Sequence, residues 1–253
     1  MQYPPISLYV HIPWCEKKCP YCDFNSYASS NIPEQDYLDC LIADLQIEAE
    51  SVQARELRSI FIGGGTPSLF SAKSLARLLQ TVAKKFHFNK DIEVTLEVNP
   101  ASADKRKFLD FFHAGINRLS IGVQSFNDSS LRDLGRIHTG IDGVSAIKLA
   151  QTAGFSNINI DLMYGLPNQS EEEALSDLSA AILQGPQHIS WYELTIEPNT
   201  MFYSNPPNLP KENTLEAIQE AGLAFLFENG YSRYEISAFS KLNHQCQHNL
   251  NYW

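Results

Sequence analysis

Three cysteines lie close together near the start of the chain, and their spacing indicates iron–sulfur chemistry. The run HIPWCEKKCPYC places Cys15, Cys19 and Cys22 in a C-x3-C-x2-C arrangement. Three thiolates can hold three corners of a cubane cluster, whereas electron-transfer clusters are usually closed by four. The fourth iron then has no protein ligand and can bind a small molecule, much as a catalytic zinc ion keeps one open position. The spacing therefore predicts a [4Fe-4S] cluster with an open site.

Two other uses of these cysteines must be weighed. A disulfide framework is not favoured, because the chain has 5 cysteines, an odd number, and no secretory segment. A structural zinc ion bound by the three cysteines and His11 is an alternative, although zinc sites usually pair two close cysteine motifs and this chain has one. Cys40 falls in an apolar helical pattern, so we predict that it is a core residue.

Composition and charge narrow the class of protein. The chain has 253 residues, 43% of them hydrophobic, which suffices for one large domain with a full core. Its net charge is −10, and tight binding to nucleic acid usually needs a basic surface, so no nucleic acid partner is expected. No transmembrane segment is predicted, while contact with a membrane surface is left open. A thiolate-bound cluster needs a reducing compartment, so we expect a cytoplasmic protein.

Short β-rich runs alternate with longer amphipathic stretches along most of the chain. This alternation predicts an α/β fold in which a parallel sheet, covered by helices, curls into a full or partial barrel. Residues 34–54 carry apolar side chains, among them Ile47, at helical spacing, and Ser71 is a predicted N-cap. The predicted strands are 7–12, 59–62, 92–98, 118–123, 158–163 and 188–194, and the predicted helices are 34–54, 71–86, 104–113, 140–153, 170–183 and 211–228.

A glycine-rich loop follows the second predicted strand. In IFIGGGTP, Gly64 and Gly65 precede Thr66, and such a loop lets a ligand approach the backbone and offers it free amides. A turn without a ligand is the alternative for the loop alone. A phosphate-binding loop is excluded, because no Gly-Lys-Ser/Thr sequence follows. We therefore expect this loop to hold a charged small molecule beside the cysteines.

Other polar residues lie at or near the carboxyl ends of the predicted strands, where active sites of such folds are found. Glu97 could accept hydrogen bonds from an ammonium group or a ribose hydroxyl, or be a solvated strand-end carboxylate. Gln124 and Asp161 interrupt apolar strands and need partners, either structural or from a ligand. Arg136 could pair with a carboxylate, with a surface position as the alternative. Tyr21, beside the third cysteine, could shield a cluster or be an ordinary core residue.

The end of the chain holds a second group of potential ligands. His244, Cys246 and His248 lie within NHQCQHNLNYW, and both residue types can bind haem iron or zinc. A polar surface loop with incidental imidazoles is the alternative. Because the chain stops at Trp253, directly after this run, we expect it to be part of a longer protein. The predicted division is a core barrel over 1–235 and the start of a further region over 236–253.

Several motifs together resemble those of the radical SAM superfamily, whose members use S-adenosylmethionine (SAM). The combination is similar to its coproporphyrinogen III oxidase-like family and, within that family, to the heme chaperones. The resemblance implies a partial (β/α)6 TIM-like barrel followed by a C-terminal domain that is largely missing from this chain. The motifs are VHIPWC, CPYCDFNSY, GGGTPS, EVNP, GVQSF, LGRIH, DLMYGLP and HNLNYW.

The resemblance also implies cofactors and the residues that bind them. The three cysteines would hold a [4Fe-4S] cluster, and an HNxxYW motif would be associated with haem. The matching positions are Tyr9, Gly64 and Glu97 for the SAM on the cluster; Gly65, Thr66, Gln124, Arg136 and Asp161 for a second SAM; Tyr21 beside the cluster; and His248, Asn249, Tyr252 and Trp253 for haem.

Two functions are compatible with this resemblance. The first is a heme chaperone that binds haem and delivers it to apoproteins. The alternative is an oxygen-independent coproporphyrinogen III dehydrogenase, in which a 5′-deoxyadenosyl radical drives oxidative decarboxylation of propionates on a porphyrinogen. Only fourteen residues precede Cys15, and Phe24 stands where the dehydrogenase has a further cysteine. Both features favour the chaperone; no catalytic residue is assigned, and whether the protein is an enzyme is left open.

Overall fold

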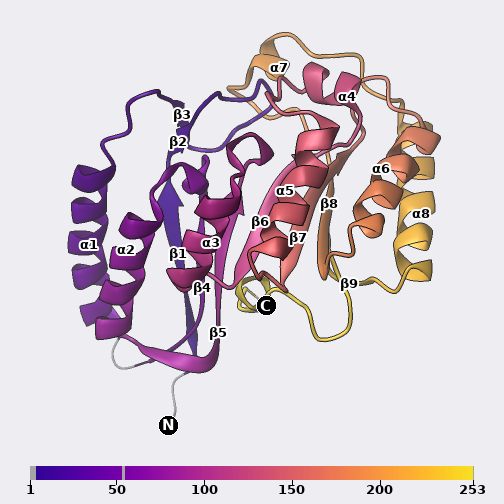
Figure 1. The fold of residues 1–253 in the computed structure, drawn as a ribbon. Coiled ribbons are helices and arrows are strands. Elements are labelled where there is room, and N and C mark those ends of the chain that lie inside the picture. Colours follow the sequence, from indigo (N-terminus) through magenta and orange to yellow (C-terminus); the bar gives the residue numbers. More distant parts are fainter. Residues whose placement is uncertain (1–3, 53–54, 253) are drawn as a thin grey trace.

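A curved eight-stranded sheet organises the fold, with six neighbouring parallel strands followed by two antiparallel ones (Figure 1). The computed structural model describes residues 4–52 and 55–252. The strand order is β1-β4-β5-β6-β7-β8-β10-β9. The strands are β1 (Ile6–Ile12), β4 (Glu56–Gly64), β5 (His87–Val98), β6 (Arg118–Gln124), β7 (Ile158–Tyr164), β8 (His188–Glu193), β9 (Ser232–Glu235) and β10 (Ala238–Ser240).

Six helices connect the strands and cover one face of the sheet, as Figure 1 shows. Short elements cap the two ends of the molecule. The long helices are α1 (Glu34–Ser51), α2 (Ala72–Lys85), α3 (Lys105–His113), α5 (Gly140–Thr152), α6 (Glu171–Leu183) and α8 (Glu212–Glu228). The short elements are β2 (Trp14–Cys15), β3 (Tyr27–Ala28), η1 (Pro67–Leu69), η2 (Pro100–Ser102), α4 (Asp128–Asp133), α7 (Met201–Ser204) and α9 (Gln247–Leu250).

The two faces of the sheet differ in chemistry because side chains alternate along a strand. On β5, Val94 and Leu96 join the core between sheet and helices, and residues such as Ile60 and Ile160 do the same on their strands. The other face, which lines the inside of the half-barrel, is polar. Its side chains include Ser59, Glu93, Thr95, Glu97, Arg118, Ser120, Gln124, Asn159, Asp161, His188, Ser190 and Tyr192.

The predicted partial barrel is confirmed. Each predicted strand and helix has a counterpart in the structure, and most of their ends differ from the prediction by no more than a few residues. Ser71 is the N-cap of α2, where its side chain accepts a hydrogen bond from the amide of Ser74. The predicted core position of Cys40 is wrong, since this thiol is exposed. Ile47 is also 69% exposed. Leu38 and Leu45 form the buried stripe of α1, and the other two residues lie outside it.

The two ends of the half-barrel carry different segments. The parallel strands run upward in Figure 1, so β2, β3, α4 and α7 lie at their carboxyl ends. The C-terminal segment returns to the opposite end, where α9 packs against β4. Among the described residues, no helix is both long enough and apolar enough to cross a membrane.

Candidate functional site: a cavity at the carboxyl ends of the parallel strands

A cavity of about 500 Å³ opens at the carboxyl ends of the six parallel strands, and residues of each strand or of the loop after it line its wall. The cavity lies at the strand ends where the sequence placed the polar residues. The predicted site residues in its wall are Cys15, Cys19, Tyr21, Cys22, Gly64, Gly65, Thr66, Glu97, Gln124, Arg136 and Asp161.

The cysteine loop is held in shape by backbone contacts. Strand β2 pairs with β3 in parallel and so closes the base of the loop. The amide of Cys22 donates to the carbonyl of Cys19 at 3.1 Å. Lys18 Nζ donates to the carbonyls of Phe24 and Ser26, at 2.9 and 3.1 Å. These contacts turn the three thiols towards the same cavity.

The glycine loop fits directly against the cysteine loop. A Cβ atom on Gly65 would lie 2.5 Å from the carbonyl oxygen of Trp14 and 3.0 Å from Cys15 Sγ, so only glycine permits this approach. The amides of Gly65 and Thr66 donate to the carbonyls of Ile12 and Trp14, and the Gly64 amide donates to Glu97. The prediction that these amides are free for a ligand is therefore wrong; they fix the loop instead.

The donor set suits an iron–sulfur cluster with one open position. Three soft thiol ligands share one cavity wall, and thiolates are the usual ligands of such clusters. In residues 4–52 and 55–252, no three His, Cys, Asp or Glu side chains come close enough to hold a single metal ion. His11, the fourth ligand of the zinc alternative, has its two ring nitrogens hydrogen-bonded to Tyr9 Oη and to the carbonyl of Asn25.

Arg136 reaches the cysteine loop from the far side of the cavity. Its Nη1 lies 3.6 Å from Cys19 Sγ, and its Nη2 donates to the carbonyl of Gly122 at 2.7 Å. Within the described part of the chain, its Nε is buried without a hydrogen-bond partner. The surface position considered for Arg136 is therefore wrong. Arg136 therefore places a positive charge beside the Cys19 sulfur.

Two carboxyl groups make the cavity suited to a positively charged ligand. Burial, together with the nearby Asp161, raises the pKa of Glu97 to about 8. Burial also raises the pKa of Asp161, although hydrogen bonds from Ser120 and Asn159 oppose this effect. A cationic group that enters the cavity would reverse both shifts, because it stabilises the carboxylates. The pair therefore attracts a ligand with an ammonium or sulfonium charge.

Gln124 has an unusual backbone conformation at the end of β6. Its φ is +68°, a region that non-glycine residues seldom adopt, and such strain is often found at functional sites. Its Oε1 accepts a hydrogen bond from Tyr192 Oη at 2.6 Å. Tyr192, Ser120 and Ser190 also line the cavity and were missed by the sequence prediction. The two-residue period of β6 and β8 could have identified them, since it places them on the inner face.

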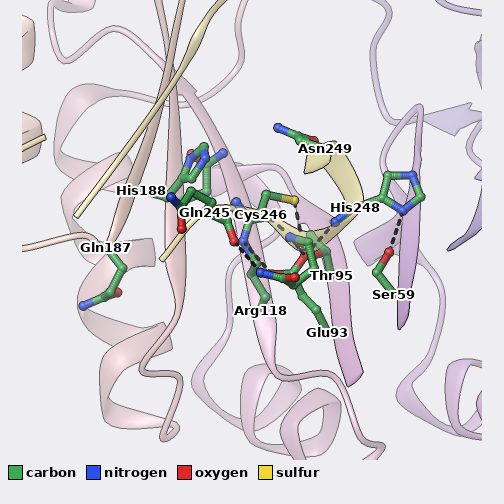
Figure 2. A network of polar contacts seen from close by, with 12 residues as sticks. Ser59, Glu93, Thr95, Arg118, Gln187, His188, Gln245, Cys246, His248 and Asn249 are labelled. Carbon is green, nitrogen blue, oxygen red and sulfur yellow. Dashed lines mark hydrogen bonds and ion pairs between the residues drawn. The ribbon is translucent and has the colours of Figure 1, made fainter. Parts of the chain in front are cut away.

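Tyr9 and His248 do not line this cavity. The ring of Tyr9 stacks on Phe61 at 6.2 Å between centroids, and Phe61 lies 5.1 Å from the ring of His248. Both Cys246 and His248 are buried, so the surface-loop interpretation of that segment is wrong for these two residues. Figure 2 shows His248 beside Ser59, with Cys246 above Glu93. The predicted haem residue Trp253 lies outside the described residues.

Known proteins resemble this chain over most of its length. The model of the radical SAM superfamily matches residues 9–181. The "Heme chaperone HemW" of Haemophilus influenzae is 55% identical over 99% of this chain and 67% of its own length. The protein of the same name from Escherichia coli is 51% identical over 100% of this chain and 67% of its own length. The chain thus spans about two thirds of these relatives.

A solved structure has the same fold. The coproporphyrinogen III oxidase HemN of Escherichia coli, described as a radical SAM enzyme, superposes with a TM-score of 0.86 at 30% sequence identity, covering 95% of this chain and 56% of HemN. The superfamily implies SAM and a [4Fe-4S] cluster as cofactors, and the three thiols in the cavity wall agree with this. The chain belongs to the radical SAM superfamily and, within it, to the heme chaperone HemW family.

Proposed function

We propose that this protein binds haem through the segment that carries His248 and delivers it to haem-requiring apoproteins in the cytoplasm. Relatives named as heme chaperones are 47–55% identical to nearly the whole of this chain. The observation that carries the proposal is the state of the His248 ring, which is held in one orientation by a neighbouring serine.

Hydrogen bonds define which ring nitrogen of His248 carries the lone pair. Ser59 Oγ donates its proton to Ser7 Oγ at 2.6 Å, so it can only accept from His248 Nδ1, 3.1 Å away. The lone pair therefore lies on Nε2, which faces the hydroxyl of Tyr252 at 3.4 Å. Burial, with Arg118 nearby, lowers the pKa of His248 to about 4. A neutral imidazole with its lone pair on Nε2 is what ligation of haem iron requires, and the iron would take the place of the Tyr252 hydroxyl.

The cofactor cavity would serve the family's two other groups. Cys15, Cys19 and Cys22 would hold the cluster, and Glu97 and Asp161 would face the positive end of SAM. When bound, the cluster supplies an electron for reductive chemistry on the sulfonium of SAM. The chain's own residues would exclude water and hold polar groups in place around the two cofactors. Arg136 lies beside Cys19, and Tyr192 donates a hydrogen bond to Gln124.

The haem site is tested by changing the two histidines of the same segment separately. In the full-length protein, His248→Ala should weaken haem binding at least about tenfold, because the iron loses a neutral nitrogen ligand. His244→Ala is the control, since His244 is not held in the Ser59–Tyr252 contacts. Titration of haem, followed by its absorbance, gives both affinities. Equal affinities for His248→Ala and the unmodified protein would remove His248 as the ligand.

A second function is favoured by the intact cavity. Its wall carries the residues expected to hold SAM, and the fold matches HemN with a TM-score of 0.86. On this alternative the protein is an oxygen-independent coproporphyrinogen III dehydrogenase. Anaerobic incubation of the cluster-loaded, full-length protein with SAM, a strong reductant and coproporphyrinogen III decides between the two. Loss of two carboxyl groups from the porphyrinogen supports the dehydrogenase, whereas no decarboxylation supports the chaperone.

A further inference from the structure

A continuous path of hydrogen bonds joins the cofactor cavity to the haem-binding segment. It begins at Asp161, whose Oδ1 accepts from Asn159 Nδ2 at 2.7 Å. Asn159 Oδ1 lies 2.6 Å from His188 Nδ1, and His188 Nε2 lies 2.7 Å from Tyr234 Oη. Tyr234 Oη in turn accepts from the amide of Cys246 at 3.1 Å and from Asn249 Nδ2 at 3.2 Å. The path therefore runs from β7 through β8 and β9 to α9.

The direction of each hydrogen bond on this path can be assigned. Asn159 Nδ2 faces the acceptor Asp161, so its Oδ1 must accept from His188 Nδ1–H. Burial lowers the pKa of His188, so its Nε2 carries no proton and accepts from the hydroxyl of Tyr234. Tyr234 thus uses its one proton and both of its lone pairs. Asn159 also donates to Ser120 and accepts from Ser190, so Asn159, His188 and Tyr234 have every donor and acceptor in use. None of the three can change partner without affecting the next.

A second arrangement of the same groups reverses the direction of the hydrogen bonds on the path. If a ligand draws Asp161 away, the Asn159 amide can turn its NH2 group towards His188. The proton of His188 would then move from Nδ1 to Nε2, and Nε2–H would donate to Tyr234 Oη. Tyr234 would need a new acceptor for its own proton, and it would lose one of the two donors from the Cys246–Asn249 region. The contacts of Tyr234 with α9 and with its N-cap, Cys246, would change as a result.

Glu93 provides a separate anchor that keeps α9 close to the sheet. Its Oε1 accepts from the amides of Gln247 and His248, at 2.9 and 3.3 Å, and from Cys246 Sγ. The guanidinium of Arg118 lies 3.9 Å from Oε2 of Glu93 (Figure 2). The hydrogen bonds of this anchor do not include Asp161. The anchor can therefore hold the segment in both arrangements of the path.

We propose that Tyr234 is a positioning residue which, through His188 and Asn159, couples ligand binding at Asp161 to haem binding at His248. The inference rests on the proposed haem function. Coupling between two sites is reciprocal and typically changes affinity by about 5- to 150-fold. A ligand in the cavity would therefore change how tightly haem is held, and haem would change the affinity of the cavity for its ligand by the same factor.

The test is the dissociation constant of haem, measured on the full-length, cluster-loaded protein under anaerobic conditions with and without saturating SAM. The unmodified protein should show a change of about fivefold or more. Tyr234→Phe should bring the ratio of the two constants close to one, because the path is cut. Tyr231→Phe is the matched control: its buried hydroxyl donates to the Pro186 carbonyl, away from the path, so the ratio should be kept.

Hydrogen exchange of the amides at 246–249 supplies a readout that needs neither haem nor a variant. Adding SAM to the unmodified, haem-free protein should change their exchange rates, and unchanged rates would overturn the coupling. An unmodified protein that binds both ligands with a ratio of one would also overturn it, while leaving the haem function intact. Failure to bind haem at all would instead remove the proposed function. A wild-type ratio in Tyr234→Phe would exclude this path.

Discussion

Glu97 Oε2 accepts a hydrogen bond from the Gly64 amide at 2.9 Å, so the carboxyl group at the end of β5 holds the loop that follows β4. The same carboxyl group is buried, and its pKa is raised to about 8. In the ligand-free protein it is therefore mostly protonated at pH 7. Glu97 therefore fixes the loop after β4 and also carries a proton that it can release inside the cavity.

The first prediction is that binding of SAM releases a proton from Glu97. An ammonium group beside the carboxyl lowers its pKa below neutral, so close to one proton should leave at pH 7. Release should fall as the pH rises through 8, because the free protein is then already ionised. Calorimetry of the cluster-loaded protein in buffers of different ionisation enthalpy measures this number. Glu97→Gln should release none. In the unmodified protein, a difference in binding heat between buffers that stayed the same at every pH would contradict the assignment.

The second prediction concerns the contact between the two loops. Gly65→Ala should abolish most cluster incorporation, because its Cβ would collide with the Trp14 carbonyl and press on Cys15 Sγ. Iron and sulfide content per folded protein is the measurement. Gly185→Ala is the control: Gly185 has a φ of +69° but no neighbour within 4 Å of an added Cβ. It should cost about 1 kcal/mol of stability and keep the cluster. A full cluster in Gly65→Ala would show that the loops can separate freely.

Local patterns in the sequence predicted much of the fold and the site residues at the carboxyl ends of the parallel strands. The alternation of strands and helices gave the half-barrel, because each helix follows its strand in sequence. Cys15, Gly65 and Glu97 were recognised because they lie in the loops and strand ends that such a fold brings together. The free amides were predicted wrongly, since the carbonyls of Ile12 and Trp14 that engage them belong to another segment.

The lower part of the half-barrel depends on contacts between residues far apart in the chain. Glu93 on β5 and Arg118 on β6 meet Cys246 only because the segment after β10 returns beneath the sheet. His188 on β8 reaches the same segment through Tyr234. No local period shows that return. The division into 1–235 and 236–253 stays a prediction, with β10 forming part of the same sheet as the barrel strands.

The third prediction tests the packing of α8 on the sheet. A Cβ atom on Gly222 would overlap the indole ring of Trp191, which is itself buried in the core. Gly222→Ala should therefore destabilise the protein by about 2 kcal/mol or more, since overfilling a packed core forces side chains from their preferred rotamers. Denaturant unfolding measures the change. Glu220→Ala, exposed on the same helix, should stay within about 0.5 kcal/mol; a similar loss in both variants would exclude the packing explanation.

The fourth prediction concerns the buried pair beneath α9. Glu93→Ala should cost about 3–5 kcal/mol, because it leaves the fully buried Arg118 without its carboxylate partner and removes the acceptor of the His248 amide. Arg118→Met leaves Glu93 unpaired and should cost a similar amount. The double variant should lose less than the two single losses added together, since neither charge is then buried alone. Denaturant unfolding of all four proteins completes the cycle. Strict additivity would mean that Glu93 and Arg118 do not stabilise each other. Glu93 would then hold α9 only through the backbone amides that donate to its carboxyl group.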